Sequence, residues 1–241
     1  MKVGSSLLLL IVLLAAAVPA AAQDEALLSF TGYDYQTDGS PNAIYLALGD
    51  SYYAVGFVTS FHPTWLDPYT NPVANEYTLY QHGLVVDSYS FSNNVLVVRF
   101  APGGVVEYFE DGSRDARNPP NPPNCPSYGS NPPNADAPSK FKNGTLAISG
   151  SLDNASLYFD YSGTGQGGFQ SEMNITGGAD AIYVPAPSWG GWFMSGLVTP
   201  PAGGNPCAAP AGYDHQISGE CRHPVVATSR GTWGQLKKLY R

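Results

Sequence analysis

Charged side chains are scarce in this sequence. Asp, Glu, Lys and Arg make up 12% of its 241 residues, and the 19 acidic residues outnumber the 11 basic ones. This imbalance, with a pI near 4.7, excludes the basic surface that binding to nucleic acid requires. Uninterrupted helical stretches are equally rare, because 27 Gly and 21 Pro are spread through the chain. The composition therefore disfavours long helices.

Long hydrophobic runs are absent after residue 22, where no stretch approaches the ~18–20 apolar residues that cross a bilayer. Before that point, Lys2 precedes an apolar run at 7–18 and the small residues 20–22. This is the pattern of a secretory signal peptide. We therefore expect residues 1–22 to be removed, leaving 219 residues beginning at Gln23. The mature protein should be secreted or held at the cell surface, without a transmembrane segment.

Cysteine is also sparse, with three residues in all. Cys207 and Cys221 enclose 13 residues rich in turn formers. A disulfide closing a loop of that size stabilises a protein by about 3 kcal/mol, so export predicts a Cys207–Cys221 bridge. For Cys125 the sequence leaves three states open: a free thiol, an intermolecular disulfide, or a disulfide to either other cysteine.

Paired metal ligands are missing as well. The four histidines show no zinc-binding spacing, and we expect neither a metal nor another cofactor. Asp111 and Asp115 flank Gly112 and Arg114, which does not match a calcium loop, so this segment is interpreted as a charged surface turn.

What the sequence does contain is a series of short runs rich in Tyr, Val and Phe, separated by turn residues. These predict an all-β fold, an antiparallel β-sandwich with a jelly roll as one topology, over residues 23–227. The Pro- and Asn-rich segment 111–138 is expected to be a long loop inserted in one domain, or else a linker between two halves. The expected strands are 26–30, 43–48, 51–61, 76–80, 84–91, 95–100, 105–109, 145–149, 155–161, 168–175 and 181–184.

Two segments of the chain share a pattern. Residues 32–39 and 212–219 both read G-Y-D-x-Q-x-x-G, with five matches in eight positions. Either two Tyr- and Gly-rich turns agree by chance, or the segments occupy equivalent places near the two ends of the domain.

The run from Ile44 to Tyr52 passes from an apolar strand into Gly49-Asp50-Ser51. It resembles the first block of the GDS, or SGNH, esterase family, and Glu220 with His223-Pro224 resembles that family's C-terminal D-x-x-H-P pattern. The resemblance implies an α/β esterase with Ser51 as nucleophile, His223 as base and Glu220 as the carboxylate that orients it. The residues themselves favour a β-hairpin turn, in which Gly49 adopts a positive φ and Asp50 caps the turn.

Aromatic residues are plentiful, and Trp189 and Trp192 are candidates for a surface that stacks on sugar rings. The alternative is that both indoles fill the core of the fold.

The C-terminal tail, residues 228–241, is basic in an acidic protein. Its apolar side chains fall at helical spacing, and the tail is either a docking or sorting element, which includes contact with anionic lipid, or a helix packed on the domain. The tail residues that carry this prediction are Trp233, Leu236, Lys237, Lys238, Tyr240 and Arg241.

Together these features predict an exported, non-catalytic protein of the cell exterior that binds a surface or serves as a structural component. Its partner would be extracellular or part of the cell envelope. The alternatives are a secreted GDS-like esterase using Ser51, and a carbohydrate-binding module with a glycan as partner.

Overall fold

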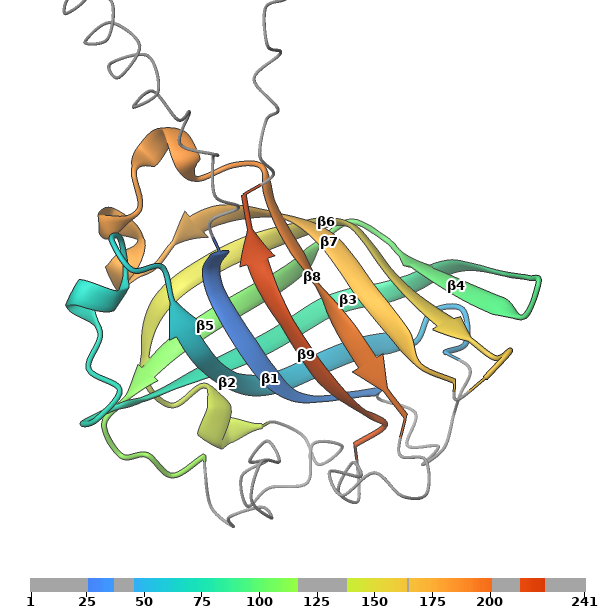
Figure 1. The fold of residues 1–241 in the computed structure, drawn as a ribbon, viewed down its shortest axis with the longest axis horizontal. Helices are drawn as coiled ribbons and strands as arrows, with labels where there is room; N and C mark the ends of the chain where they lie inside the picture. Colours follow the sequence, from blue (N-terminus) through green and yellow to red (C-terminus); the bar gives the residue numbers. More distant parts are fainter. Residues whose placement is uncertain (1–25, 37–45, 117–137, 164, 201–212, 224–241) are drawn as a thin grey trace, which may run out of the picture. The chain divides into compact units, whose positions relative to one another are not determined.

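The computed structural model describes residues 26–36, 46–116, 138–163, 165–200 and 213–223, which form nine β-strands and four short 3-10 helices, without an α-helix (Figure 1). The predicted all-β class is therefore confirmed. The strands are β1 (Ala26–Gln36), β2 (Ser51–Phe61), β3 (Glu76–Ser92), β4 (Val95–Phe100), β5 (Gly104–Asp111), β6 (Thr145–Asp160), β7 (Gly167–Gly177), β8 (Trp192–Thr199) and β9 (His215–Arg222). The 3-10 helices are η1 (Asp67–Tyr69), η2 (Ser139–Phe141), η3 (Ala179–Tyr183) and η4 (Ala186–Ser188).

The strands close into one antiparallel barrel with eight strand positions. Each strand except β4 pairs with the next along the chain, and β9 returns to pair with β1 from Asp34↔His215 to Ala26↔Arg222. Strands β4 and β5 share a single position, since both lie between β3 and β6. The predicted sandwich of two sheets is thus corrected to a closed barrel. Closure pairs the first strand with the last and removes both edges that a sandwich would leave exposed.

Strand β1 runs on to Gln36, beyond the expected 26–30, and two further strands are longer than expected because each continues through a bulge. Strand β3 joins two predicted strands across Gly83, whose φ of +75° suits glycine. Strand β6 does the same near Asn154, where the register to β7 shifts. The β3–β4 hairpin turns on Asn93 and Asn94, both with positive φ, as a two-residue turn of the I′ kind requires.

Alternate residues of every strand fill the barrel with apolar side chains. The rings of Phe30 and Phe169 lie 5.9 Å apart over Gly219 and Gly196, which face each other on β9 and β8. A Cβ at Gly219 would lie 2.6 Å from the Phe169 ring and 3.1 Å from the Phe30 ring. The absence of side chains at these positions therefore makes room for the two rings.

One end of the barrel is closed by η1, η3 and η4, and Figure 1 shows these turns gathered where β1 begins and β9 ends. Leu66, Val184 and Trp192 are buried there. Residues 181–184, predicted as a strand, instead belong largely to η3, because Gly178 with a φ of +110° turns the chain out of the sheet. We call this the closed end.

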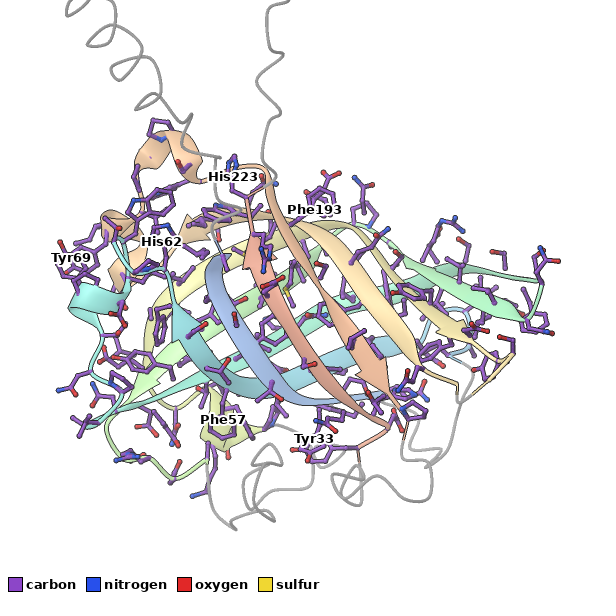
Figure 2. The ribbon with its side chains drawn as sticks, in the orientation of Figure 1. Tyr33, Phe57, His62, Tyr69, Phe193 and His223 are labelled. Atoms are coloured by element: carbon purple, nitrogen blue, oxygen red, sulfur yellow. The ribbon has the colours of Figure 1, made fainter. Side chains whose placement is uncertain are left out.

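A second apolar cluster lies on the outer face of β1, β2, β3 and β5. Its rings include Tyr33 and Phe57, which Figure 2 shows on the side facing η2, where Phe141 contacts Phe57 at 5.3 Å. Tyr213 packs on Tyr33 at 5.2 Å and so covers the β1–β9 pair from outside. This cluster makes one wall of the barrel two layers thick.

All described strands belong to a compact unit, Glu25–Pro224. The Pro- and Asn-rich segment falls in the β5–β6 connection, but its residues 117–137 lie outside the described part of the chain, as do the signal segment and the C-terminal helix predicted at 228–241. Within the described ranges, no helix has the length and hydrophobicity needed to span a membrane.

Candidate functional site

Polar side chains gather inside the barrel at the end opposite η1, η3 and η4. Asp34 on β1, Tyr52 on β2 and His215 on β9 all point inward, since each alternates with outward-facing neighbours. We call this the Asp34 end. Strands β1, β3, β6 and β8 end there, and β2, β4, β7 and β9 begin there.

Asp34 is the centre of a buried hydrogen-bond network. Its side chain has no exposed surface, and Oδ1 accepts from His215 Nδ1 at 2.9 Å and from the His215 backbone N–H at 2.8 Å. Oδ2 accepts from the Tyr52 hydroxyl at 2.9 Å. Three donors from two other strands therefore satisfy one buried carboxylate, as a buried charge requires.

The network alters proton affinities. Burial lowers the pKa of His215, but the negative charge and hydrogen bond of Asp34 outweigh burial, so the net shift is upward, with a smaller contribution from Asp214. Burial, followed by the nearby charge of Asp34, raises the pKa of Tyr52 well above its ordinary value. His215 is thus biased toward its charged form and Tyr52 toward its neutral form, and His215 Nε2 is the ring nitrogen not used by Asp34.

A small pocket adjoins this network. It spans about 240 Å³ including space open to solvent, and its enclosed part is about the size of one water. A pocket of this size accepts a single polar group rather than a whole drug-sized ligand. Its lining residues are Gln36, Leu46, Tyr52, Leu157, Phe159, Asp214 and His215.

Aromatic side chains extend from the pocket along the β3–β4 hairpin. Phe159 lies 5.1 Å from His215 between ring centroids, Tyr161 lies 6.5 Å from Phe159, and Phe91 lies 6.2 Å from Tyr161. Tyr89 and Phe91 pair with Val98 and Leu96, so they share the inner face of the sheet. They are nevertheless 57% and 59% exposed. We call Tyr89, Phe91, Phe159 and Tyr161 the aromatic lip.

The repeated sequence pattern builds this site. The first copy of G-Y-D-x-Q, residues 32–36, is the end of β1, and the described part of the second copy, residues 213–216, leads into the start of β9, which places His215 opposite Asp34. The sequence shows this pattern but does not by itself identify Asp34, Tyr52 or His215 as site residues. The available signal was the pattern itself, in which His215 stands where the first copy has Tyr35.

The residues of the esterase hypothesis are not brought together. Ser51 begins β2 at the Asp34 end and pairs with the outward-facing Val85, whereas His223 follows β9 at the closed end, as Figure 2 shows. The 11-residue strand β1 runs from the closed end to the Asp34 end, so the ends that hold His223 and Ser51 are roughly 33 Å apart along the strand. Glu220 pairs with Arg222 Nη2 at 2.6 Å. The expected turn at Gly49-Asp50 is confirmed: Gly49 has a φ of +88° and Asp50 Oδ2 accepts from the Ala47 N–H.

The two candidate sugar-stacking tryptophans belong to the closed end. Trp192 is fully buried and its indole N–H donates to the Ser188 carbonyl, while the Trp189 indole donates to the Val184 carbonyl at 3.0 Å. Both rings pack with the core, which is the alternative that the sequence left open. In this structure, Trp192 presents no face to a ligand.

The expected Cys207–Cys221 bridge is not formed, because Cys221 carries a free thiol buried inside the barrel, and burial raises its pKa. Cys207 and Cys125 lie outside the described residues, as do all the residues of the predicted docking tail, from Trp233 to Arg241.

Three carboxylates meet near the start of β3, where Glu76, Asp111 and Asp115 place oxygens within 4.8 Å of one another. Lys140 Nζ lies 2.6 Å from Asp115, and the Lys140 hydrogen bond lowers the pKa of that carboxyl. Asp111 is the buried last residue of β5 and accepts from the Ser113 backbone N–H, so only residues 112–114 form the exposed turn expected for this segment. A lysine ammonium therefore already supplies positive charge beside this group.

Comparison of the chain with known protein families, curated proteins and solved structures found no match. The function has to be inferred from the geometry of the Asp34 end.

Proposed function

We propose that this chain is an exported, non-catalytic binding protein that holds one sugar unit of a cell-exterior glycan at the Asp34 end of its barrel. The observation that carries this proposal is the exposure of Tyr89 and Phe91 on the inner face of the sheet. Side chains on that face are buried elsewhere in the barrel, so an exposed pair of rings beside a pocket is typical of a ligand-binding surface.

The aromatic lip and the pocket offer complementary chemistry. Aromatic rings stack on the apolar faces of sugars, and the lip provides such rings next to the pocket. The pocket provides Gln36, Asp214 and His215, whose amide, carboxylate and imidazole groups hydrogen-bond hydroxyls. Because its enclosed part is about the size of a water molecule, it suits one hydroxyl group, while the sugar ring rests on the lip.

A fixed polar group beside the lip would also give the site its specificity. The two Asp34 carboxylate oxygens lie 2.9 and 3.2 Å from His215 Nδ1, so the imidazole has one orientation before a ligand arrives. A preorganised donor lowers the entropic cost of binding. The network therefore supports recognition of a hydroxyl at a defined position.

Binding to a glycan array, followed by calorimetry on the best ligand, tests the proposal. Phe91→Ala and Tyr89→Ala should each weaken binding by about tenfold, given the ~0.5–1.5 kcal/mol of an aromatic contact and its loss of buried area. Tyr158→Ala is the matched control, since Tyr158 is 44% exposed on the outer face opposite Val97. No binding to any glycan, or equal losses in all three variants, would overturn the proposal.

A second candidate function follows from the Asp34–His215 pair. A histidine oriented by a carboxylate is the arrangement of a general base, and a hydrolase would use His215 to activate water. Hydrolysis of p-nitrophenyl esters that is lost in His215→Asn but retained in Ser51→Ala would favour this function. Hydrolysis that instead depends on Ser51 would restore the GDS-like esterase.

We propose the location of the protein from the sequences of its two terminal segments. We expect residues 1–22 to direct export and residues 228–241 to dock the protein at the cell exterior, since basic and aromatic groups are combined there. The barrel would then act at the cell surface or outside the cell.

A further inference from the structure

The chain segments that follow β1, β3, β6 and β8 lack positive side chains. In the sequence they contain neither Lys nor Arg, although each one links a strand that ends at the Asp34 end to a strand that begins there. These segments are residues 37–50, 93–94, 161–166 and 200–214. Acidic residues do stand beside the strand ends: Asp50 precedes β2, Asp160 ends β6 and Asp214 precedes β9. No cation from these segments is available to neutralise them, so the Asp34 end favours a positively charged ligand.

The pocket itself has a net negative charge. Asp214 lines it beside His215, and its described lining contains no Lys or Arg. When the imidazole of His215 is protonated, Asp34 offsets its charge, and when the imidazole is neutral, Asp34 adds a second negative charge. Either state leaves at least the charge of the Asp214 carboxylate. The attraction for a cationic group therefore does not depend on the protonation of His215.

Aromatic rings surround the same pocket. Tyr52 and Phe159 line it, and the Phe159 ring lies 5.1 Å from His215 and 6.5 Å from Tyr161 between centroids. The face of an aromatic ring is the negative part of its quadrupole and attracts a cation within about 6 Å of the ring centre. A carboxylate and aromatic faces together match an organic cation better than they match a neutral group.

The size of the pocket selects among organic cations and among sugar substituents. Its enclosed part is about the size of one water molecule. A protonated amine is as compact as a hydroxyl, carries a full charge and donates three hydrogen bonds. A guanidinium or an N-acetyl group contains several heavy atoms and is larger than this space. Among these groups, a primary ammonium fits the pocket in both size and charge.

We propose that the sugar unit held at the Asp34 end is an amino sugar with a free, protonated amine, whose ammonium group lies in the pocket beside Asp214. This inference rests on the proposed function, because it names the class of sugar that the pocket and the aromatic lip hold. An amino sugar keeps the apolar ring face that stacks on the lip, so the ammonium replaces one hydroxyl without changing the other contacts.

The test compares three β-1,4-linked oligosaccharides of equal length that differ only in the group at carbon 2. The oligomers of glucosamine, glucose and N-acetylglucosamine carry an ammonium, a hydroxyl and an acetamido group there. Calorimetry uses the mature protein at about pH 6, where the amine is protonated. The glucosamine oligomer should bind about tenfold more tightly than the glucose oligomer, through its charged hydrogen bond and its contact with the rings. The N-acetylglucosamine oligomer should bind most weakly, because the acetamido group exceeds the enclosed space.

Two variants that each remove one negative charge locate the preference. Asp214→Asn keeps the shape of the side chain, so it should weaken binding of the glucosamine oligomer about tenfold and leave binding of the glucose oligomer unchanged. Unchanged glucose binding also shows that this variant is folded. Asp67→Asn is the matched control, since Asp67 is an exposed residue of η1 at the closed end. It should leave the affinity for each oligomer unchanged.

The outcomes separate this inference from the proposed function. Equal affinities for the glucosamine and glucose oligomers would overturn the inference and leave glycan binding in place. A preference that persists in Asp214→Asn, or that falls equally in Asp67→Asn, would do the same, as would tight binding only to glycans without a free amine. Absence of binding to these oligomers and to every glycan on the array would overturn the proposed function itself, and the inference with it.

Discussion

Asp34 and His215 form a buried pair across the seam at which the barrel closes, with 2.9 Å between Asp34 Oδ1 and His215 Nδ1. They are 181 residues apart in sequence but directly opposite in the register of β1 and β9. The same contact thus joins the first strand to the last and places an oriented imidazole beside the pocket.

Removal of Asp34 should destabilise the protein strongly. In Asp34→Ala, the His215 and Tyr52 donors lose their buried acceptor, and breaking a buried pair costs about 3–5 kcal/mol. Urea unfolding of the purified variant measures the loss. Lys140→Ala is the control, because it breaks a partly exposed pair with Asp115 that contributes about 0–1 kcal/mol. Equal costs for the two variants would contradict the proposed role of Asp34.

Stability should depend on the protonation of His215. Its folded pKa is raised above the unfolded value near 6.5, so the charged pair stabilises the fold fully below about pH 6.5. The stabilisation is lost as the pH rises through the folded pKa. Unfolding free energies measured from pH 5.5 to 9 should therefore fall with rising pH.

His215→Asn isolates this effect from the other histidines. His62, His82, with Glu107 at 3.3 Å, and His223 are unchanged in this variant, so their contributions cancel in the comparison. Asp34, Asp214 and Tyr52 surround position 215 in both proteins being compared. The difference in stability between wild type and variant should shrink as the pH rises. A difference that stays constant with pH would show that the pKa of His215 is the same in the folded and the unfolded protein.

The glycines beneath the two core rings should tolerate no side chain. In Gly219→Ala the new Cβ would lie 2.5 Å from the Ser195 carbonyl and 2.6 Å from the Phe169 ring. Overpacking of this kind costs about 1–3 kcal/mol, which thermal unfolding will detect. Gly163→Ala is the control, since a Cβ there meets nothing within 4 Å, and it should change stability by less than about 0.5 kcal/mol.

Deletion of residues 228–241 should alter location more than stability. The hydrogen-bonded barrel is complete between residues 26 and 222, so the melting temperature should fall by only a few degrees. Fusion of the tail to an exported reporter should increase retention at the cell surface. A large fall in melting temperature, with no effect on the reporter, would show that the tail is a packed helix.

Local signals in the sequence were sufficient for most strands and turns. The β-rich runs of β2, β4, β5 and β7 and the turn at Gly49-Asp50 follow from composition and glycine geometry, which act within a few residues. At Gly83 and Asn154 the same signals predicted two strands, whereas in the structure a single strand continues through a bulge at each position.

Barrel closure could not be predicted because it depends on β9. That strand, His215–Arg222, contains charged and small residues and lacks a β-rich run, and its place is determined by pairing with β1 and β8. The site at the Asp34 end could not be predicted for the same reason. Asp34 and His215 are ordinary residues in sequence, and only the register of distant strands makes them a pair. Likewise, Trp192 gave no sign of whether it would face the core or a ligand.

The most direct test of the Asp34 end as the binding site is chemical-shift mapping by NMR on the mature protein with the best glycan from the array. The largest changes should fall on Gln36, Tyr52, Phe91, Phe159 and His215. Changes centred on the outer face around Tyr158, or on the closed end around Tyr69 and His223, would contradict the account.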